Sequence, residues 1–222
     1  MSELIDACKE NNTETALKLI KDKANIDVQN NHGWTALIWS CAKNNTKIAL
    51  KLIENKANLD IQDNDRWSAL MKSCHNNNTK IALKLIENKA NIDLQDNLGE
   101  TALMSSCCNH NTILTLKLIE NNAALDIQDK DGDTALMRSC KSGDTDVMIK
   151  LIENNADIDL QNIDGYNTLI WSCSTNINTE IILYLIENKA NLDLQSNYGR
   201  TALMESCQIN NIEVISYMLE FF

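Results

Sequence analysis

Two short strings decide the fold: "TALMSSC" at residues 101–107 and "LIENNA" at residues 118–123. Close copies of the second string begin at residues 19, 52, 85, 118, 151 and 185, so successive copies start 33 residues apart, except the last, which starts 34 residues after the one before it. Close copies of the first string begin at residues 35, 68, 101, 134, 167 and 201. A repeat of roughly 20–50 residues is typical of a stacked array in which each unit packs against its neighbours.

Each unit predicts two helices followed by an extended arm. In the second unit the first helix begins at Thr35, a good N-cap residue, and Leu37 and Cys41 then fall on one face. The second helix begins at Asn45 and buries a face that contains Leu52. The stretch after it alternates apolar and polar residues and ends in turn residues, which indicates a short arm with a tip.

The predicted fold is therefore an all-α repeat solenoid of helix-turn-helix and hairpin-loop units, stacked into a curved array. We expect a single domain over residues 1–222, because no long connector interrupts the repeat. The expected units are 1–29, 30–62, 63–95, 96–128, 129–161, 162–195 and 196–222. The extra residue of the sixth unit falls within "STNIN" at 174–178.

Seven of the eight cysteines occupy the same place in successive units. These are Cys8, Cys41, Cys74, Cys107, Cys140, Cys173 and Cys207. Stacked helices lie about 10 Å apart, whereas a disulfide needs Cα atoms within roughly 7 Å and zinc ligands must converge at about 2.0–2.3 Å from one ion. The ladder therefore predicts small buried thiols, with no metal site.

A metal or thiol-redox protein is the alternative from a different class. It would use Cys107, Cys108, His110, His75 or Cys74, and His75 and Cys108 stand at equivalent positions of adjacent units. Two ligands are too few for a structural zinc site, and the sequence contains no CxxC. Since Cys108 lies outside the ladder, it is the one thiol that we expect an alkylating reagent to modify readily.

Composition excludes several classes of function. The net charge is −11 and no run of Lys or Arg stands out, which argues against binding to nucleic acid or to an anionic membrane surface. The N-terminal "MSELIDACKENN" lacks the apolar core of a signal peptide, and no apolar run approaches the roughly 18–20 residues that span a bilayer. We expect a cytoplasmic or nuclear protein with reduced thiols. No phosphate-binding loop, nucleophile elbow or HExxH motif is present, so we expect no enzyme activity and no cofactor.

The repeat resembles the ankyrin repeat, a family whose 33-residue unit has a signature close to "D-x-x-G-x-T-P-L-H-x-A-A-x-x-G-H". The resemblance covers nearly the whole chain. It implies a non-enzymatic scaffold that binds a protein partner through a concave groove and the hairpin tips. A narrower alternative is a proteasome-assembly chaperone similar to gankyrin, which has a comparable length and number of repeats.

Departures from the family pattern are expected to have local effects. At the tip glycine, the third unit carries Arg66, which predicts an altered tip there. The glycine between the helices is replaced by residues that tolerate a left-handed backbone, namely Asn11, Asn44, Asn77, His110, Asn176 and Asn210. The glycine after the second helix is replaced in most units by Lys or Asn, which predicts modest strain.

Positions that vary between repeats are expected to face solvent, where a partner can read them. The resemblance places such positions in the groove and at the tips. The predicted partner-binding residues are Trp34, Trp39, Trp67, Lys72, His75, Glu100, Ser105, Cys108, Asp133, Arg138, Tyr166, Trp171, Tyr198 and Arg200. All four tryptophans of the chain are among them, and exposed aromatic residues are common anchors of protein interfaces. The alternative is that the tryptophans lie flat on neighbouring hairpins and only stabilise the stack.

The charges at these positions change along the array. Glu100, Asp131 and Asp133 form an acidic middle beside Arg138 and Lys141, which predicts a partner with basic residues near that point. A solvated polar face with no partner is the alternative.

A second ladder of acidic residues follows the second helices. It comprises Asp27, Asp60, Asp93, Asp126, Asp159 and Asp193. Carboxylates one repeat apart cannot converge on calcium, so each is expected to accept hydrogen bonds from turn amides.

The two phenylalanines, Phe221 and Phe222, are the last residues and either cover the open end of the array or belong to a longer protein. We expect a monomer.

Overall fold

The computed structural model describes residues 2–175 and 178–220, which form fourteen helices and no strand. The chain divides into two compact units, Met1–Ala123 and Ala124–Phe222, called here the N-terminal unit and the C-terminal unit. The N-terminal unit contains α1 (Glu3–Lys9), α2 (Thr13–Lys21), α3 (Ala36–Ala42), α4 (Thr46–Glu54), α5 (Ala69–His75), α6 (Thr79–Glu87), α7 (Ala102–Cys108) and α8 (Thr112–Glu120). The C-terminal unit contains α9 (Ala135–Ser142), α10 (Thr145–Glu153), α11 (Thr168–Ser174), α12 (Thr179–Glu187), α13 (Ala202–Gln208) and α14 (Ile212–Leu219).

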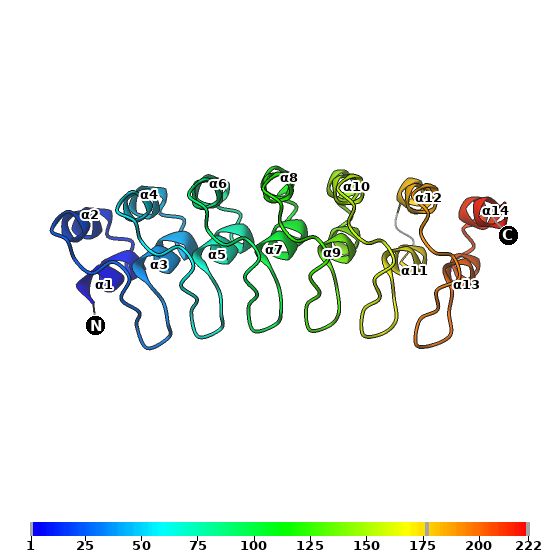
Figure 1. Ribbon diagram of the computed structural model, residues 1–222, viewed down its shortest axis with the longest axis horizontal. Coiled ribbons are helices and arrows are strands. Elements are labelled where there is room, and N and C mark those ends of the chain that lie inside the picture. The colour runs from blue at the N-terminus through cyan, green and yellow to red at the C-terminus, as the bar shows by residue number, and fades with distance from the viewer. Residues whose placement is uncertain (1, 176–177, 221–222) are drawn as a thin grey trace. The chain divides into compact units, whose positions relative to one another are not determined.

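Each unit is layered in the same way. The odd-numbered helices form one row, the even-numbered helices form a second, outer row, and the arms project from the first row away from the second (Figure 1). In the N-terminal unit α1, α3, α5 and α7 pack in succession, as do α2, α4, α6 and α8. In the C-terminal unit α11 packs against α9 and α13, and α12 packs against α14. The predicted all-α repeat solenoid is therefore confirmed.

Side-chain caps begin most helices where the sequence predicts them. Thr35 Oγ1 accepts a hydrogen bond from the backbone N–H of Ile38 at 3.2 Å, and Asn45 Oδ1 accepts one from the N–H of Ile48 at 3.0 Å. Asn78 is an exception because its side-chain amide donates to the carbonyl of Cys41, and α6 begins without a side-chain cap. At the equivalent positions Asn111 Oδ1 and Asp144 Oδ1 do cap α8 and α10.

The repeat-constant apolar residues form the core. Leu37, Ile38 and Cys41 of α3, like Leu52 of α4, are at most 1% exposed, and their equivalents recur in the following repeats. Six ladder cysteines are buried, but Cys207 is exposed, which corrects the prediction of a seven-membered buried ladder. The reason is local: no described repeat covers the side of α13 on which Cys207 lies.

Left-handed backbone occurs where the family pattern has glycine. The interhelix residues Asn11, Asn44, Asn77, His110 and Asn210 have φ between 53° and 59°, as predicted, while Asn176 lies outside the described residues. Arg66 also adopts φ 62°, and its N–H donates to the carbonyl of Asp63 at 2.8 Å, as Gly33 N–H does to Asn30 at 2.9 Å. The expectation of an altered tip at Arg66 was therefore wrong, because the turn is kept and the strain is tolerated.

Polar side chains connect successive arms. Gln29 Nε2 donates to the carbonyls of Gly33, 2.8 Å away in its own arm, and of Gln62, 3.0 Å away in the next. Gln62 repeats the second bond to Gln95 at 3.0 Å. This glutamine ladder was not predicted, although Gln recurs at the same place in every arm.

The aspartate ladder performs the predicted capping, across repeats. Asp27 Oδ1 accepts the N–H of Asn58 at 2.9 Å, and Asp60 Oδ1 accepts that of Asn91 at 2.8 Å. Each carboxylate thus fixes the start of the following arm. The questions raised for Phe221 and Phe222 fall outside the described residues.

Candidate functional site

Three tryptophans of the N-terminal unit gather on α3 and on the arms before α3 and α5. Trp34 and Trp39 stack with ring centroids 4.2 Å apart and an interplanar angle of 47°. Trp67 meets the ring of His75 edge-on, with centroids 5.1 Å apart. All three tryptophans are half-buried. We call Trp34, Trp39, Trp67, Lys72 and His75 the N-terminal aromatic surface.

Lys72 joins the two arms of this surface. Its Nζ lies 4.1 Å from the ring centroid of Trp67 and 4.9 Å from that of Trp34. The same Nζ lies 3.6 Å from Oδ2 of Asp63, whose side chain is fully buried. Asp63 Oδ1 accepts the backbone N–H groups of Asp65 and Trp67. The ammonium therefore orients both rings and neutralises a buried carboxylate, and cation–π contacts of this kind contribute about 0.5–2 kcal/mol.

Two cavities adjoin Trp39 and share its ring and His32 as walls. One, of about 370 Å³, is lined by Ile5, Asp6, Lys9, Asn30 and Asn31 in addition to the shared residues. The other, of about 360 Å³, is lined by Trp34, Asn64 and Asp65 in addition to the shared residues. The indole Nε1 of Trp39 is buried and has no hydrogen-bond partner among the described residues. A side chain entering either cavity would contact an aromatic wall and one carboxylate.

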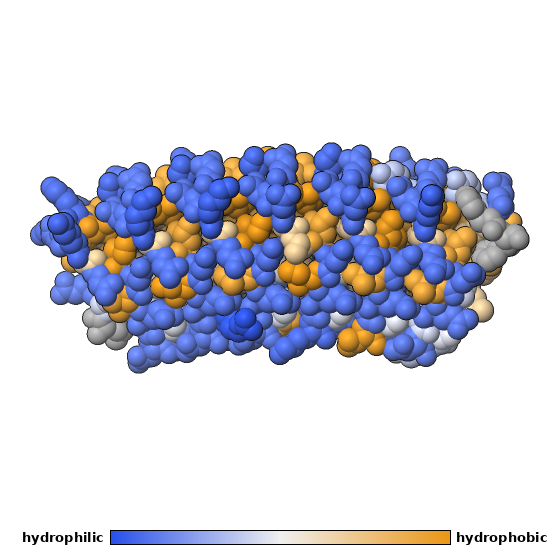
Figure 2. All heavy atoms as spheres, viewed as in Figure 1, coloured by the Kyte–Doolittle hydropathy of each residue, from blue (hydrophilic) through white to orange (hydrophobic). Residues whose placement is uncertain are grey.

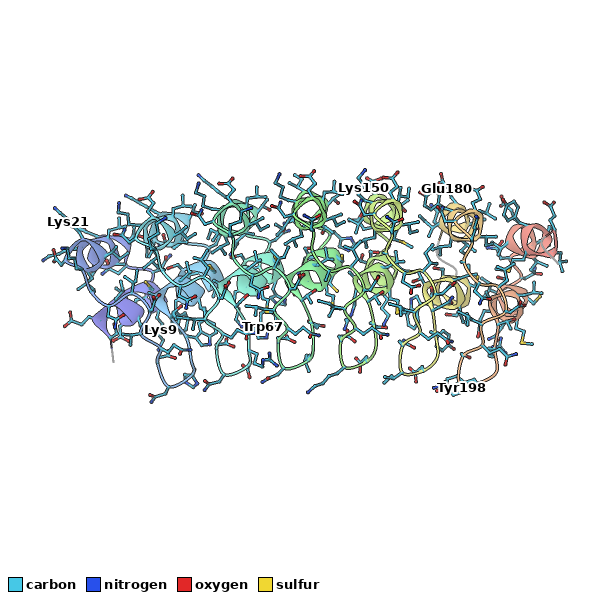
Figure 3. All side chains as sticks on the ribbon, viewed as in Figure 1. Lys9, Lys21, Trp67, Lys150, Glu180 and Tyr198 are labelled. Carbon is cyan, nitrogen blue, oxygen red and sulfur yellow. The ribbon has the colours of Figure 1, made fainter. Side chains whose placement is uncertain are left out.

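The C-terminal unit has a smaller aromatic surface, formed by Lys141, Tyr166 and Trp171. The ring centroids of Tyr166 and Trp171 lie 5.9 Å apart in an edge-on arrangement, and Lys141 Nζ lies 4.5 Å from the centroid of Trp171. The pKa of the Tyr166 hydroxyl is raised, first by desolvation and then by the negative charge of Glu205. Tyr198 is 71% exposed at the tip of the next arm. Figure 3 shows Trp67 of the N-terminal unit beside its arm and Tyr198 at the end of its own arm.

Ion pairs bury two acidic residues at variable positions, one of which, Asp133, was predicted to face a partner. Asp133 is only 2% exposed, because Lys141 Nζ lies 2.5 Å and Arg138 Nε 3.7 Å from its Oδ2. Arg138 also pairs with Asp129. Glu205 is buried by Arg200, whose Nε donates to it at 2.6 Å. The predicted acidic middle was therefore wrong for Asp133, since its charge is neutralised within the unit.

The remaining predicted residues divide between surface and core. Ser105 is 6% exposed, so the prediction that it faces solvent was wrong. Glu100 is half-buried, and His75 and Cys108 are exposed. Cys108 is not the one exposed thiol, because Cys207 is exposed as well. The structure brings the residues of each aromatic surface together but does not unite all the predicted positions into one site.

One pattern in the sequence could have revealed these pairs. The residue that opens each tip turn lies nine positions before the variable residue of the first helix. Where the helix carries a cation, at Lys72 and Arg138, the turn residue is the aspartate with which it pairs, Asp63 and Asp129. Where the helix carries Trp39 or Trp171, the turn residue is asparagine. The fourth unit is an exception, because Asp96 opens its turn although the helix carries Ser105. Variability at these positions therefore partly records internal charge compensation.

The ladder thiols have little acidity. Burial raises the pKa of Cys8 and Cys140 to about 11 and that of Cys41 and Cys173 to about 12. Hydrogen bonds with a serine of the next repeat oppose the shift only in part, as between Cys140 Sγ and Ser172 Oγ, 3.0 Å apart. Over the described parts of the chain, no group of three or more His, Cys, Asp or Glu side chains could hold a metal ion.

Over residues 2–175 and 178–220, every helix is too short or too polar to cross a bilayer.

Comparisons with known proteins agree with the repeat. A family model described as ankyrin repeats (3 copies) matches residues 4–96, 78–162 and 149–221. No curated protein matches the sequence.

Three solved structures are similar to the chain. The ankyrin repeat domain of Bcl-3, a member of the IkappaB family, is 18% identical, with a TM-score of 0.82 over 96% of this chain and 97% of that one. A chain from the complex of the endopeptidase Bd0816 of Bdellovibrio bacteriovorus with the immunity protein Bd3460 is 24% identical, with a TM-score of 0.73 over 87% and 99%. The ankyrin repeat protein EF0377 is 25% identical, with a TM-score of 0.77 over 82% and 96%.

Proposed function

This chain belongs to the ankyrin repeat family, and we propose that it is a non-enzymatic module that binds a protein partner through its aromatic surfaces. The observation that carries the proposal is the pair of cavities beside Trp39 in the N-terminal unit. Aromatic rings held in a fixed orientation next to a cavity provide anchor sites at low entropic cost, as interface hot spots do. Proteins of this fold are generally interaction modules, and one similar structure comes from a protein–protein complex.

In this proposal the tryptophans both stabilise the stack and anchor a partner. Trp34 and Trp67 stabilise the stack, because both contact Lys72 and because Trp34 also packs on Trp39. The half-exposed part of each ring remains accessible to a partner. The proposed binding residues are therefore Trp34, Trp39, Trp67 and His75 in the N-terminal unit, with Tyr166, Trp171 and Tyr198 in the C-terminal unit. Lys72, Arg138 and Arg200 act mainly by positioning their neighbours.

The proposal is tested by selecting peptides from a random display library against the wild-type chain. Affinities of the selected peptides are then measured for Trp39→Leu and for a control, Lys47→Ala, which changes an exposed residue of α4. Leucine keeps an apolar side chain at position 39, so circular dichroism should report an intact fold. We expect about tenfold or greater weakening for Trp39→Leu, the loss of one hot-spot contact. Equal affinities for wild type and a folded Trp39→Leu variant would contradict the proposal.

We propose further that residues 1–222 act as one domain of seven units, in a cytoplasmic or nuclear environment. The continuous repeat register and the eight free cysteines support this assignment. A single cooperative unfolding transition, the same by fluorescence and circular dichroism, is the expected result. Two separate transitions would divide the chain into independent domains.

A further inference from the structure

The outer row of helices carries a second surface, which the proposed function does not use. Figure 2 shows hydrophobic residues in the grooves between successive second helices and hydrophilic residues on their crests. In the C-terminal unit the groove between α10 and α12 contains a cavity of about 280 Å³. Ile149 of α10 and Leu183 of α12 supply its apolar walls, and Tyr184 adds an aromatic one.

Two carboxylates stand at this groove. Glu180 and Glu187 both line the cavity and are both exposed. Across residues 2–175 and 178–220 neither forms an ion pair with Lys or Arg. Figure 3 shows Glu180 on the outer side of α12. Tyr217 Oη lies 3.5 Å from Glu187, and the pKa of that hydroxyl is raised, first by desolvation and then by the charge of Glu187.

The same groove has the opposite charge in the N-terminal unit. Between α2 and α4 a cavity of about 590 Å³ has Leu17 and Leu50 as apolar walls. Three lysines and one glutamate also line it, namely Lys21, Lys47, Lys51 and Glu54, so its net charge is positive. Lys51 pairs with Glu54 one turn away, and the same pair recurs as Lys84 with Glu87, Lys117 with Glu120 and Lys150 with Glu153. On α12 the lysine of this series becomes Tyr184, so Glu187 loses its partner. The negative charge at the groove between α10 and α12 therefore does not follow from the repeat itself.

The C-terminal unit as a whole is negatively charged, as the groove between α10 and α12 is. Residues 124–222 contain 16 acidic and 6 basic residues, against 15 and 14 in residues 1–123. Of the six, Arg138, Lys141, Lys150 and Arg200 already pair with acids of their own unit. Excess charge of one sign speeds the encounter with a partner of the other sign.

We propose that the groove between α10 and α12 binds a basic amphipathic helix of a protein partner. Glu180 and Glu187 are seven residues apart on one helix, so their Cα atoms lie about 10 Å apart along its axis. A partner helix with arginine or lysine at i and i+7 presents two cations at that spacing. Apolar side chains at i+3 and i+4 of the partner then face Ile149 and Leu183, as in other helix-in-groove complexes.

A designed peptide tests the proposal directly. The probe is an Ala/Gln-based helix of about 15 residues, with two arginines seven residues apart and two leucines between them; its counterpart carries glutamate in place of both arginines. Binding of the labelled peptides to the full chain is measured by fluorescence anisotropy. We expect the arginine peptide to bind, more weakly as salt is added, and the glutamate peptide not to bind.

Two matched double variants separate a local site from diffuse attraction. Glu180→Gln with Glu187→Gln should weaken the probe about three- to tenfold, the range for two exposed ion pairs. Asp131→Asn with Asp164→Asn removes the same charge from exposed tip residues and should leave the affinity unchanged. Equal weakening by both pairs, or equal binding of the two peptides, would overturn the proposal, as would no binding of the arginine peptide at millimolar concentration.

The groove between α10 and α12 shares no residue with either aromatic surface. The Trp39→Leu variant should bind the probe as the wild type does. If that variant loses the probe and the Glu180/Glu187 variant keeps it, the probe occupies the aromatic surface and the outer groove is not its site.

Discussion

The N-terminal and C-terminal units are built from one repeat and present two different surfaces. Their buried positions are nearly interchangeable: Leu85 and Leu185 are both fully buried at the same place in the repeat. Their outer helices differ, since three lysines and one glutamate line the groove between α2 and α4, while two glutamates and no lysine line the groove between α10 and α12. The constant positions therefore specify the fold, while the charge around the outer grooves changes between the two units.

Alkaline pH should affect the units unequally and give the largest effect. The folded-state pKa of each buried thiol lies above its ordinary value of 9.0, reaching about 11 for Cys8 and about 12 for Cys41. The unfolded chain therefore loses protons first, so stability is complete below pH 9 and falls as the pH rises towards 11–12. Each such thiol costs about 1 kcal/mol of unfolding free energy per pH unit in that range.

The N-terminal unit should contribute more to this loss, because Cys8, Cys41 and Cys74 lie in it, whereas Cys207 of the C-terminal unit is exposed. Urea unfolding of the whole chain at pH 7 and pH 10, followed by tryptophan fluorescence, measures the total loss of unfolding free energy. Cys74→Ala should flatten the pH dependence. An unchanged slope in that variant would show that the thiols are not the titrating groups.

Core truncation should be equally harmful in the two units. Leu85→Ala and Leu185→Ala each remove a fully buried side chain, and each is expected to lower the unfolding free energy by about 2–5 kcal/mol. Denaturant titration measures both. A difference of more than about 2 kcal/mol between them would exceed what similar burial explains and would mean that the two cores are not equivalent.

Removing one cation should distinguish the two buried ion-pair systems. Arg138→Met leaves Asp129 buried without its partner, and a loss of about 2–4 kcal/mol is expected. Lys72→Met breaks only a 3.6 Å contact to Asp63, and its apolar stem still covers the rings, so about 1 kcal/mol is expected. Adding Asp63→Asn to Lys72→Met should restore stability. Asn30 already occupies the equivalent turn position in the repeat that carries Trp39, where the helix supplies no cation. A loss for Lys72→Met as large as that for Arg138→Met would reverse this ranking.

The helix-surface ion pairs should contribute least. Lys51→Ala removes an exposed pair with Glu54 and should change the unfolding free energy by less than about 0.5 kcal/mol. The comparison with α12, where Tyr184 replaces the lysine, predicts that Lys51→Tyr is similarly neutral for stability. A measured loss above about 1 kcal/mol in thermal unfolding would assign these pairs a structural role.

The repeat, its helices and its left-handed positions were predictable because each depends on local chemistry that recurs. Thr35 caps whichever helix follows it, and Asn44 adopts φ 54° through its own backbone preference. The glutamine ladder was equally regular, but its bonds join backbone atoms of different repeats, which the pattern alone does not place.

The site was less predictable, because the exposure of a side chain depends on which neighbouring side chains pair with it. Asp133 varies between repeats as a surface residue does, yet Lys141 and Arg138 enclose it. Arg66 keeps a glycine-type turn because the surrounding arm bonds hold it, which no propensity for arginine indicates. Cys207 carries the ladder pattern, but burial requires a following repeat.

The glutamine ladder also has a consequence for how such a gene can change in length. The side chain of Gln62 donates to the carbonyl of Gln95, 33 residues later, and that of Gln161 donates to the carbonyl of Gln195, 34 residues later. The bond therefore requires the equivalent residue of the next arm and tolerates a change in the number of residues between the two. An in-frame duplication or deletion of one whole repeat would therefore recreate every such bond at the new junction. Unequal recombination can lengthen or shorten this protein without any compensating mutation in the ladder.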